Sequence, residues 1–344
     1  MIIGIIFVII FLSILIVAHE LGHFLAARKF GLLVEEFGFG LPSKKLWSKK
    51  IGETLYSVNL LPFGGFVKIF GEDGSNLEEL PEEKRKRNFA GLKIWQRAII
   101  ISAGVIFNFA LGWIIMSFIF FIGVPKAILI TDIAKNSPAQ EIGLKLGDKI
   151  IGFENTKDAI KFINENRGKE IEIKIGRGQK ELNLKTIPRE NPPAGQGALG
   201  ISLADVGFDK KNLFSSLWEG LKTSFELSAM IFKALFELII KAVSGQGSFD
   251  SLSGPVGIVK ITNQVGQLGF IYLLQLLALI SLNLAALNIF PFPALDGGRL
   301  IFLAIEKIKG SPIKPKTEKI VNSLGLIFLM GLMIVITIKD IAKF

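Results

Sequence analysis

The sequence predicts a multi-spanning α-helical membrane protein with four transmembrane helices. Half of its 344 residues are hydrophobic, and they are concentrated in long runs rather than spread along the chain. Crossing the hydrocarbon core of a bilayer takes about 20 apolar residues, and four runs reach that length. The first starts at residue 2, and the other three cover approximately 96–124, 268–290 and 320–338.

The first run carries the only two histidines of the chain, His19 and His23, with Glu20 between them. Positions i and i+4 share one face of a helix, so both imidazoles can reach one metal ion and the glutamate can reach a water bound to it. This H-E-x-x-H pattern is typical of zinc peptidases. An acidic side chain at the centre of a membrane helix costs about 2.5–3.5 kcal/mol, which favours a functional role for Glu20.

Two plainer interpretations of this run are a histidine pair buried without a metal and a cleaved signal peptide. A signal peptide has a basic start and a small-residue cleavage site, whereas this run has an apolar start and continues into His and Glu. We therefore expect a retained helix that carries a metal site.

The basic residues indicate the orientation of the chain in the membrane. The net charge is +10, and the lysines and arginines cluster in 28–87 and 299–319, beside the apolar runs. Positive charge favours the cytoplasmic side, so we expect both segments there, with both termini and 125–267 outside. Topology and anionic lipid headgroups explain this charge, and we expect the lipid bilayer, not nucleic acid, as the partner.

Two stretches between the first and second runs, 37–40 and 56–67, are apolar with strand-like alternation. They predict a membrane-associated β-hairpin beside the metal site, with its turn at 62–65. Strand backbone at that depth needs protein or a water-filled cavity around it. The hairpin edge would suit an unwound substrate, which makes Gly65 a candidate substrate-binding residue. A simple cytoplasmic hairpin is the alternative.

Residues 126–190 lose the membrane composition and predict a small soluble domain. Strands are expected at 128–130, 171–175 and 182–184, with a short helix at 158–164. The segment that begins Asn136-Ser137-Pro138-Ala139 and continues through Gly147-Asp148 resembles bacterial PDZ domains. Such domains bind extended peptides at a sheet edge, which makes peptides candidate partners. The alternative is that these glycines and prolines only form turns.

The Pro/Gly-rich residues 188–200 are expected to form a linker. The part that follows the soluble domain, 191–267, is expected to hold most of this linker and an amphipathic helix at 218–243. Charged residues recur in that helix at helical spacings, opposite Leu, Ile and Phe. This pattern is typical of a helix lying in the membrane interface. A fifth span is the competing interpretation, and it would break the charge asymmetry.

The end of the third run supplies a carboxylate that could complete the metal site. The chain has no cysteine and no third histidine, so any further protein ligand must be Asp or Glu. The run ends at Asn288 and continues through two prolines to Asp296 and two glycines, residues that break and relax a helix. We expect Asp296 to be the third ligand on an unwound segment, and the alternative is a helix cap after a proline kink.

The H-E-x-x-H string and N-x-x-P-x-P-x-L-D-G-G, in this order and in membrane segments, resemble the site-2 protease family of intramembrane zinc metalloproteases. The string from Gly104 to Asn108 is similar to the family's G-x-x-x-N, and the alternative is a small residue that only lets two helices approach closely. With one PDZ domain between the second and third spans, the layout looks like the RseP-like (regulator of sigma-E protease) branch. Better-known members have two PDZ domains, which leaves their gating scheme open for this chain.

The resemblance implies a zinc-dependent endopeptidase of the bacterial inner (cytoplasmic) membrane that cleaves the spans of single-span membrane proteins. In relatives the substrates are anti-sigma factors and remnant signal peptides. It also implies that Asn288 and Asn108 hydrogen-bond the substrate backbone. The expected parts are 1–125 with two spans and the hairpin loop, 126–190 with the extracytoplasmic PDZ domain, 191–267 with the linker and interfacial helix, and 268–344 with the last two spans.

Two other functional classes are a PDZ adaptor with a structural metal site and a transporter of metal ions or protons. A structural zinc site normally has four protein ligands, and the chain offers no cysteine or further histidine for the fourth. Transporters commonly show internal repeats, and the sequence shows none between its halves.

Overall fold

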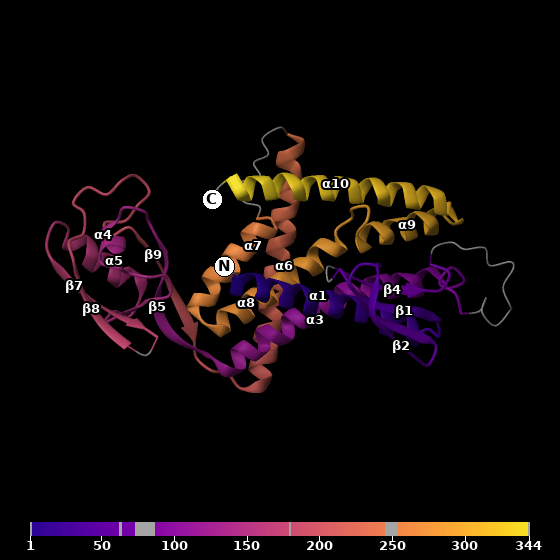
Figure 1. Ribbon diagram of the computed structural model, residues 1–344, viewed down its shortest axis with the longest axis horizontal. Helices are drawn as coiled ribbons and strands as arrows, with labels where there is room; N and C mark the ends of the chain where they lie inside the picture. The colour runs from indigo at the N-terminus through magenta and orange to yellow at the C-terminus, as the bar shows by residue number, and fades with distance from the viewer. Residues whose placement is uncertain (1, 62–63, 73–86, 179, 245–252, 343–344) are drawn as a thin grey trace. The chain divides into compact units, whose positions relative to one another are not determined.

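The computed structural model describes residues 2–61, 64–72, 87–178, 180–244 and 253–342, and it divides into two compact units (Figure 1). Several helices pass from one unit into the other. Unit 1 consists of Met1–Ile115, Leu221–Lys260 and Leu277–Phe344, and unit 2 of Met116–Gly220 and Ile261–Leu276.

Within the described residues, four helices are long and apolar enough to cross a membrane, as the sequence predicts. Proline and glycine limit several of them: α8 ends before Pro291, α10 has Pro315 at its start, and Gly269 separates α8 from the preceding helix α7. The four helices are α1 (Ile2–Lys29), α3 (Ile94–Ile122), α8 (Phe270–Ile289) and α10 (Pro315–Ala342).

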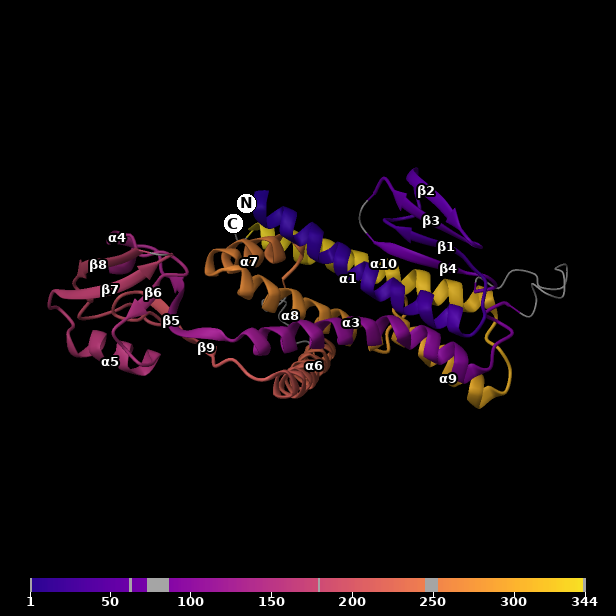
Figure 2. The same cartoon turned by 90° about the horizontal axis from the view of Figure 1, so that it is seen from below.

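Helix α6 (Leu213–Val243) is not among the four candidate spans. Its aromatic residues Trp218, Phe225 and Phe236 are exposed. Within unit 1, α6 runs across the direction of α10 in Figure 1 and is seen nearly end-on in Figure 2. Its position in the membrane interface stays a prediction.

The loop after α1 forms a four-stranded sheet where the sequence analysis expected a single β-hairpin. Its strand order is β2-β3-β1-β4, with β1 parallel to β3 and antiparallel to β4. Alternation identifies strands but not their partners, and the expected turn includes residues 62–63, which lie outside the described part. The strands are β1 (Val34–Phe39), β2 (Lys45–Ile51), β3 (Thr54–Asn59) and β4 (Gly65–Ile69).

The sheet, α1, α3 and α9 (Asp296–Lys309) share one apolar core. Phe24 of α1, Ile100 of α3 and Leu303 of α9 are buried in it. Among the described strands, β4 has only β1 as a neighbour and is therefore an edge strand of this sheet.

Unit 2 contains a five-stranded sheet in the order β8-β7-β6-β5-β9, with antiparallel neighbours. Strand β9 pairs with β5, so the sheet extends beyond residue 190, where the sequence analysis ended this domain. The sequence analysis did not predict β9, because the Pro/Gly-rich residues before it are typical of a linker. In the structure, Ala198 and Leu199 of this stretch are buried in the core of the domain. The elements are β5 (Val124–Ile133), α4 (Pro138–Glu141), β6 (Lys149–Ile151), α5 (Thr156–Glu165), β7 (Ile171–Arg177), β8 (Lys180–Thr186) and β9 (Ile201–Phe208).

The end of α10 is tied to α7 (Pro255–Leu268) by a buried carboxylate. Oδ2 of Asp340 accepts hydrogen bonds from the backbone N–H groups of Gly254 and Gly257, each at 2.8 Å. These are N–H groups that the first turn of a helix leaves without an intrahelical partner, so Asp340 caps α7 from a distant part of the sequence.

Candidate metal centre

Helix α1 presents His19 and His23 on one face, as the i, i+4 spacing predicts. Their ring centroids are 4.7 Å apart, and their Nε2 atoms are 3.1 Å apart. Both side chains are mostly buried, at 14% and 13% exposure. Two imidazole nitrogens this close would repel each other as lone pairs unless a proton or a cation lies between them.

Asp296 joins the two histidines from the first turn of α9. Its Oδ2 lies 3.2 Å from Nε2 of His19 and 3.5 Å from Nε2 of His23. The three residues each offer one ligand atom within 4.8 Å of the others. The same Oδ2 is buried without a hydrogen-bond partner in the described part of the chain, as expected of an atom reserved for a cation.

The spacing of the three atoms suits zinc. Zinc binds His nitrogen and carboxylate oxygen at about 2.0–2.2 Å in a tetrahedral shell, which places two ligand atoms about 3.3–3.5 Å apart. The distances of 3.1, 3.2 and 3.5 Å match that edge. Three protein ligands leave the fourth position open, which is the arrangement of catalytic rather than structural zinc sites.

The backbone of α3 fixes the orientation of His23. Its Nδ1 lies 2.8 Å from the carbonyl oxygen of Ile100, which can only accept a hydrogen bond, so the proton is on Nδ1. The Nε2 lone pair is then free to face the site. Such a bond to the second ring nitrogen is the usual way in which proteins orient a metal-binding histidine.

Asn108 and Asn288, the predicted substrate-binding residues, both lie beside Nδ1 of His19. Their side-chain amides are 3.4 and 3.5 Å from that nitrogen. Asn108 is only 1% exposed and its Oδ1 is buried without a partner. With Oδ1 turned towards the ring, Asn108 would accept the Nδ1 proton, which satisfies the oxygen and frees Nε2 of His19 for a metal.

Gly104 allows the imidazole rings of His19 and His23 to pack directly against the backbone of α3. A Cβ atom at this position would collide with Nε2 of His23 and lie 2.7 Å from Cε1 of His19. The sequence analysis singled out Gly104 and Asn108 as one family-like string. The structure brings both of them to the histidines, on one face of α3.

The segment between α8 and α9 positions Asp296 beside the histidines. Ala294 has a φ of 73°, in the left-handed region that costs a non-glycine residue about 1–3 kcal/mol. The bend lets α9 begin at Asp296, after Leu295, which makes no side-chain cap. Asp296 is therefore the first residue of a helix rather than part of an unwound stretch, and its own side chain points to the histidines.

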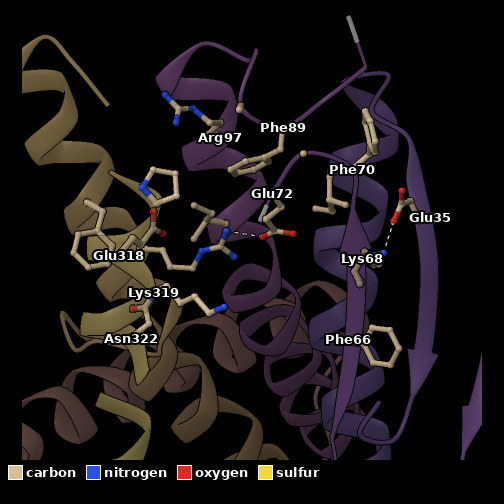
Figure 3. Close-up of a pocket in the computed structure, with 18 of the residues that line it drawn as sticks. Glu35, Phe66, Lys68, Phe70, Glu72, Phe89, Arg97, Glu318, Lys319 and Asn322 are labelled. Atoms are coloured by element: carbon tan, nitrogen blue, oxygen red, sulfur yellow. Dashed lines mark ion pairs between the residues drawn. The ribbon is translucent and has the colours of Figure 1, made fainter. Parts of the chain in front are cut away.

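The N-terminal end of β4 lies against α1 beside Glu20. A Cβ atom on Gly65 would be 3.0 Å from Cγ of Glu20. From there a cavity of about 1140 Å³ follows β4, lined by the consecutive residues 66–72 and by parts of α9 and α10 (Figure 3). A sheet face would present only alternate residues, so the cavity reaches the edge of β4, and it also extends onto β1 at Glu35 and Glu36.

Two ion pairs in this cavity were not expected from the sequence, which indicated only a basic cluster. Arg299 pairs with Glu72 at 2.5 Å and lies over the ring of Phe89. Arg97 pairs with Glu306, and both are 13% exposed. Glu72, Phe89 and Arg97 line the cavity in Figure 3. Arg299 is three residues after Asp296 on α9, so its pair with Glu72 links the ligand-bearing turn to the end of β4.

Comparison with known proteins identifies the family of the chain. Residues 7–332 match the sequence pattern of Peptidase family M50. A Clostridium perfringens relative with a zinc metalloprotease name is 36% identical over 98% of both chains. The chain is also similar to Regulator of sigma-W protease RasP of Bacillus subtilis, with 31% identity over 98% of this chain and 97% of that protein. Zinc metalloprotease RasP of Bacillus licheniformis is 32% identical over 96% of each chain. The chain therefore belongs to peptidase family M50, the site-2 protease family, and it is a membrane-embedded zinc metalloendopeptidase.

Proposed function

We propose that the chain cleaves peptide bonds within the membrane-spanning segments of single-span proteins, with zinc held by His19, His23 and Asp296. The observation that carries this proposal is the convergence of the three ligand atoms beside Glu20 on a candidate transmembrane helix. Membrane proteins such as anti-sigma factors are the expected substrates, in keeping with the sigma-W name of one relative. Remnant signal peptides are a second expected class.

Glu20 is the general base in this proposal. When bound, zinc would lower the pKa of a coordinated water towards neutrality. Glu20 lies on α1 next to His19, with Gly65 at the start of β4 against its side chain, and its carboxylate would accept the proton of that water. The same group then returns the proton to the amine that leaves when the peptide bond breaks.

The open edge of β4 is the proposed binding surface for the substrate backbone. A peptide bond inside a helix is hidden, so the substrate must unwind and lie extended. An extended segment can add to an edge strand through backbone hydrogen bonds, and β4 starts at Gly65 beside Glu20 and follows the cavity. Asn288, which is partly exposed, keeps its proposed contact with the substrate, whereas the buried Asn108 is reassigned to His19.

The part of unit 2 from β5 to β9 is the proposed PDZ domain, outside the cytoplasmic membrane of a bacterium. In its five-stranded sheet, β9 is an edge strand. The helix α5 lies near β9, because the side chain of Asp205 in β9 accepts hydrogen bonds from N and Oγ1 of Thr156, the first residue of α5, at 2.8 Å. We propose that this single domain admits only substrates whose outer domains have been removed. A peptide bound along β9 is the alternative role.

The test is cleavage of a single-span substrate by the purified protein in liposomes. We expect products cut within the apolar segment, loss of cleavage with a zinc chelator and recovery when zinc is returned. Mass spectrometry of the products locates the cut bond. Cleavage that survives the chelator, or that falls only outside the span, would contradict the proposal.

A further inference from the structure

We infer that α10 positions the metal ligand Asp296, through Asn322 and Gly325. Neither residue touches the histidines, and α10 supplies no ligand atom to the centre. Both lie instead against the bend at Pro293 and Ala294, immediately before α9. This inference rests on the proposed role of Asp296 and adds the element that keeps its carboxylate in place.

The first observation is a hydrogen bond from the bend to α10. The backbone N–H of Ala294 donates to Oδ1 of Asn322 at 3.1 Å. Ala294 is one of two described non-glycine residues with a positive φ, at 73°. Alanine has no intrinsic preference for this conformation, so the surroundings must stabilise it, and the bond to Asn322 acts on the strained residue itself.

The second observation is the close packing of α10 on the residue before the bend. Gly325 is buried, and a Cβ atom there would lie 2.6 Å from both Cβ and the carbonyl oxygen of Pro293. The ring of Phe328 is 5.7 Å from that of Phe292. Positions 322, 325 and 328 share one face of α10 because they are three residues apart, and this face follows the chain from 294 back to 292.

A change at Ala294 would move Asp296, because only one residue separates them. Metal ligands must be held within about 0.5 Å of the productive geometry by the residues around them. The alternative φ below zero would redirect the chain before α9 and withdraw the carboxylate from the histidines. Asn322 also lines the cavity (Figure 3), and its bond to Ala294 makes it a positioning residue for Asp296.

The experiment compares Asn322→Ala with Asn322→Asp, which keeps the acceptor oxygen, and with Ser323→Ala, an exposed neighbour on α10. Metal affinity is measured by competition with a chelator, and the absorption spectrum of the cobalt-substituted protein reports the ligand geometry. We expect Asn322→Ala to weaken metal binding by about 10–100-fold, the range for lost support of a ligand, and to alter the cobalt spectrum. Asn322→Asp should restore both, and Ser323→Ala should change neither. If Asn322→Ala does not fold, Asn322→Ser, whose hydroxyl cannot reach as far, takes its place with the same expectation.

A second pair of variants tests the route through Ala294. Glycine adopts a positive φ without strain, so in an Ala294→Gly background the loss of Asn322 should weaken metal binding much less than in the native background. Asp296→Ala separates the two proposals: if this variant keeps its zinc, the proposed ligand set is wrong. If Asp296→Ala loses zinc while Asn322→Ala binds it normally, or if the Ala294→Gly background gives no relief, the inference about α10 is overturned.

Discussion

A single hydrogen atom in place of a side chain at position 104 decides whether two imidazoles fit against α3. Nε2 of His23 and Cε1 of His19 occupy the space that any Cβ would need. Interiors are close-packed, and the imidazoles have little room to withdraw, because Nδ1 of His23 is bonded to the backbone of Ile100.

Gly104→Ala should therefore disturb metal binding even though it adds only one methyl group to an apolar helix. We expect zinc affinity to fall by at least about 10–100-fold, as for other changes around a metal shell, with a matching loss of cleavage. Gly331→Ala is the matched control, since it is also in a helix and nothing lies within 4 Å of its added Cβ. Equal zinc content in both variants would show that the close approach at Gly104 is unimportant.

Glu20→Gln tests whether Glu20 transfers protons without binding the zinc ion. The amide keeps the size of the side chain but cannot accept a proton, so cleavage should fall by about 10²–10⁴-fold, the typical contribution of a general base. Zinc stoichiometry should stay unchanged because Glu20 is not one of the three converging residues. Substantial turnover with full zinc would remove Glu20 from the mechanism.

The sequence predicted the three converging residues because each belongs to a motif whose chemistry requires it. Asn108 was found in the same way, and because it is buried beside His19 we propose that it orients this histidine. Asn322 and Ala294 carried no signal. A positive φ is not predicted for an alanine. The hydrogen-bond partner of an asparagine in an apolar helix depends on how that helix packs, which the sequence does not show.

Among the elements, the two sheets show that the alternation of apolar residues along a strand does not predict which strands pair. Alternation indicated strand structure at 37–40 and 56–67 but missed β2, and it could not specify that β1 pairs in parallel with β3. In unit 2 the seven-residue strands β7 and β8 were expected, whereas β9 follows a Pro/Gly-rich stretch that is typical of a connector. Its place beside β5 depends on contacts far along the chain.

A buried ion pair should contribute strongly to the stability of the sheet in unit 2. Asp148 is 2% exposed and accepts hydrogen bonds from Nε and Nη2 of Arg177 at 2.8 and 2.7 Å, which raises the pKa of Arg177. Asp148→Ala removes the buried acceptor, while Arg177 is 31% exposed and keeps its bond to the carbonyl oxygen of Gly143. We therefore expect a loss of about 1–3 kcal/mol in the free energy of unfolding of this unit.

Asp209→Ala is the control for this change, because Asp209 also pairs with a cation, Lys126, but is 85% exposed. An exposed pair contributes about 0–1 kcal/mol. Hydrogen exchange of β7 and β9 in the full chain measures both effects. Equal protection in the two variants would contradict the importance assigned to the buried pair.

For the whole molecule, the two ends of the inserted domain lie together, which allows its role to be tested by excision. A Cβ atom on Gly123 would be 2.7 Å from the backbone nitrogen of Lys210, and the N–H of Lys211 donates to the carbonyl of Phe120 at 3.1 Å. Residues 124–209 can therefore be replaced by a short glycine and serine linker without stretching the chain.

The excised protein should keep its zinc and cleave a substrate that lacks an outer domain. If unit 2 excludes larger substrates, the ratio of the cleavage rates for trimmed and untrimmed forms of one substrate should move towards one. An unchanged ratio, with both proteins active, would show that selection is made elsewhere. The boundary matters: a cut at residue 190 would leave β9 without β5.

The position of β4 at the edge of its sheet also bears on the solubility of the chain. An exposed strand edge is a template on which foreign strands stack and aggregate, and β4 is apolar at Phe66, Val67 and Ile69. Residues of α9 and α10 line the same cavity as β4. Such walls would hinder the stacking of a whole foreign sheet more than the entry of one extended chain, so we expect the same feature to limit aggregation and to favour unfolded polypeptide as the substrate.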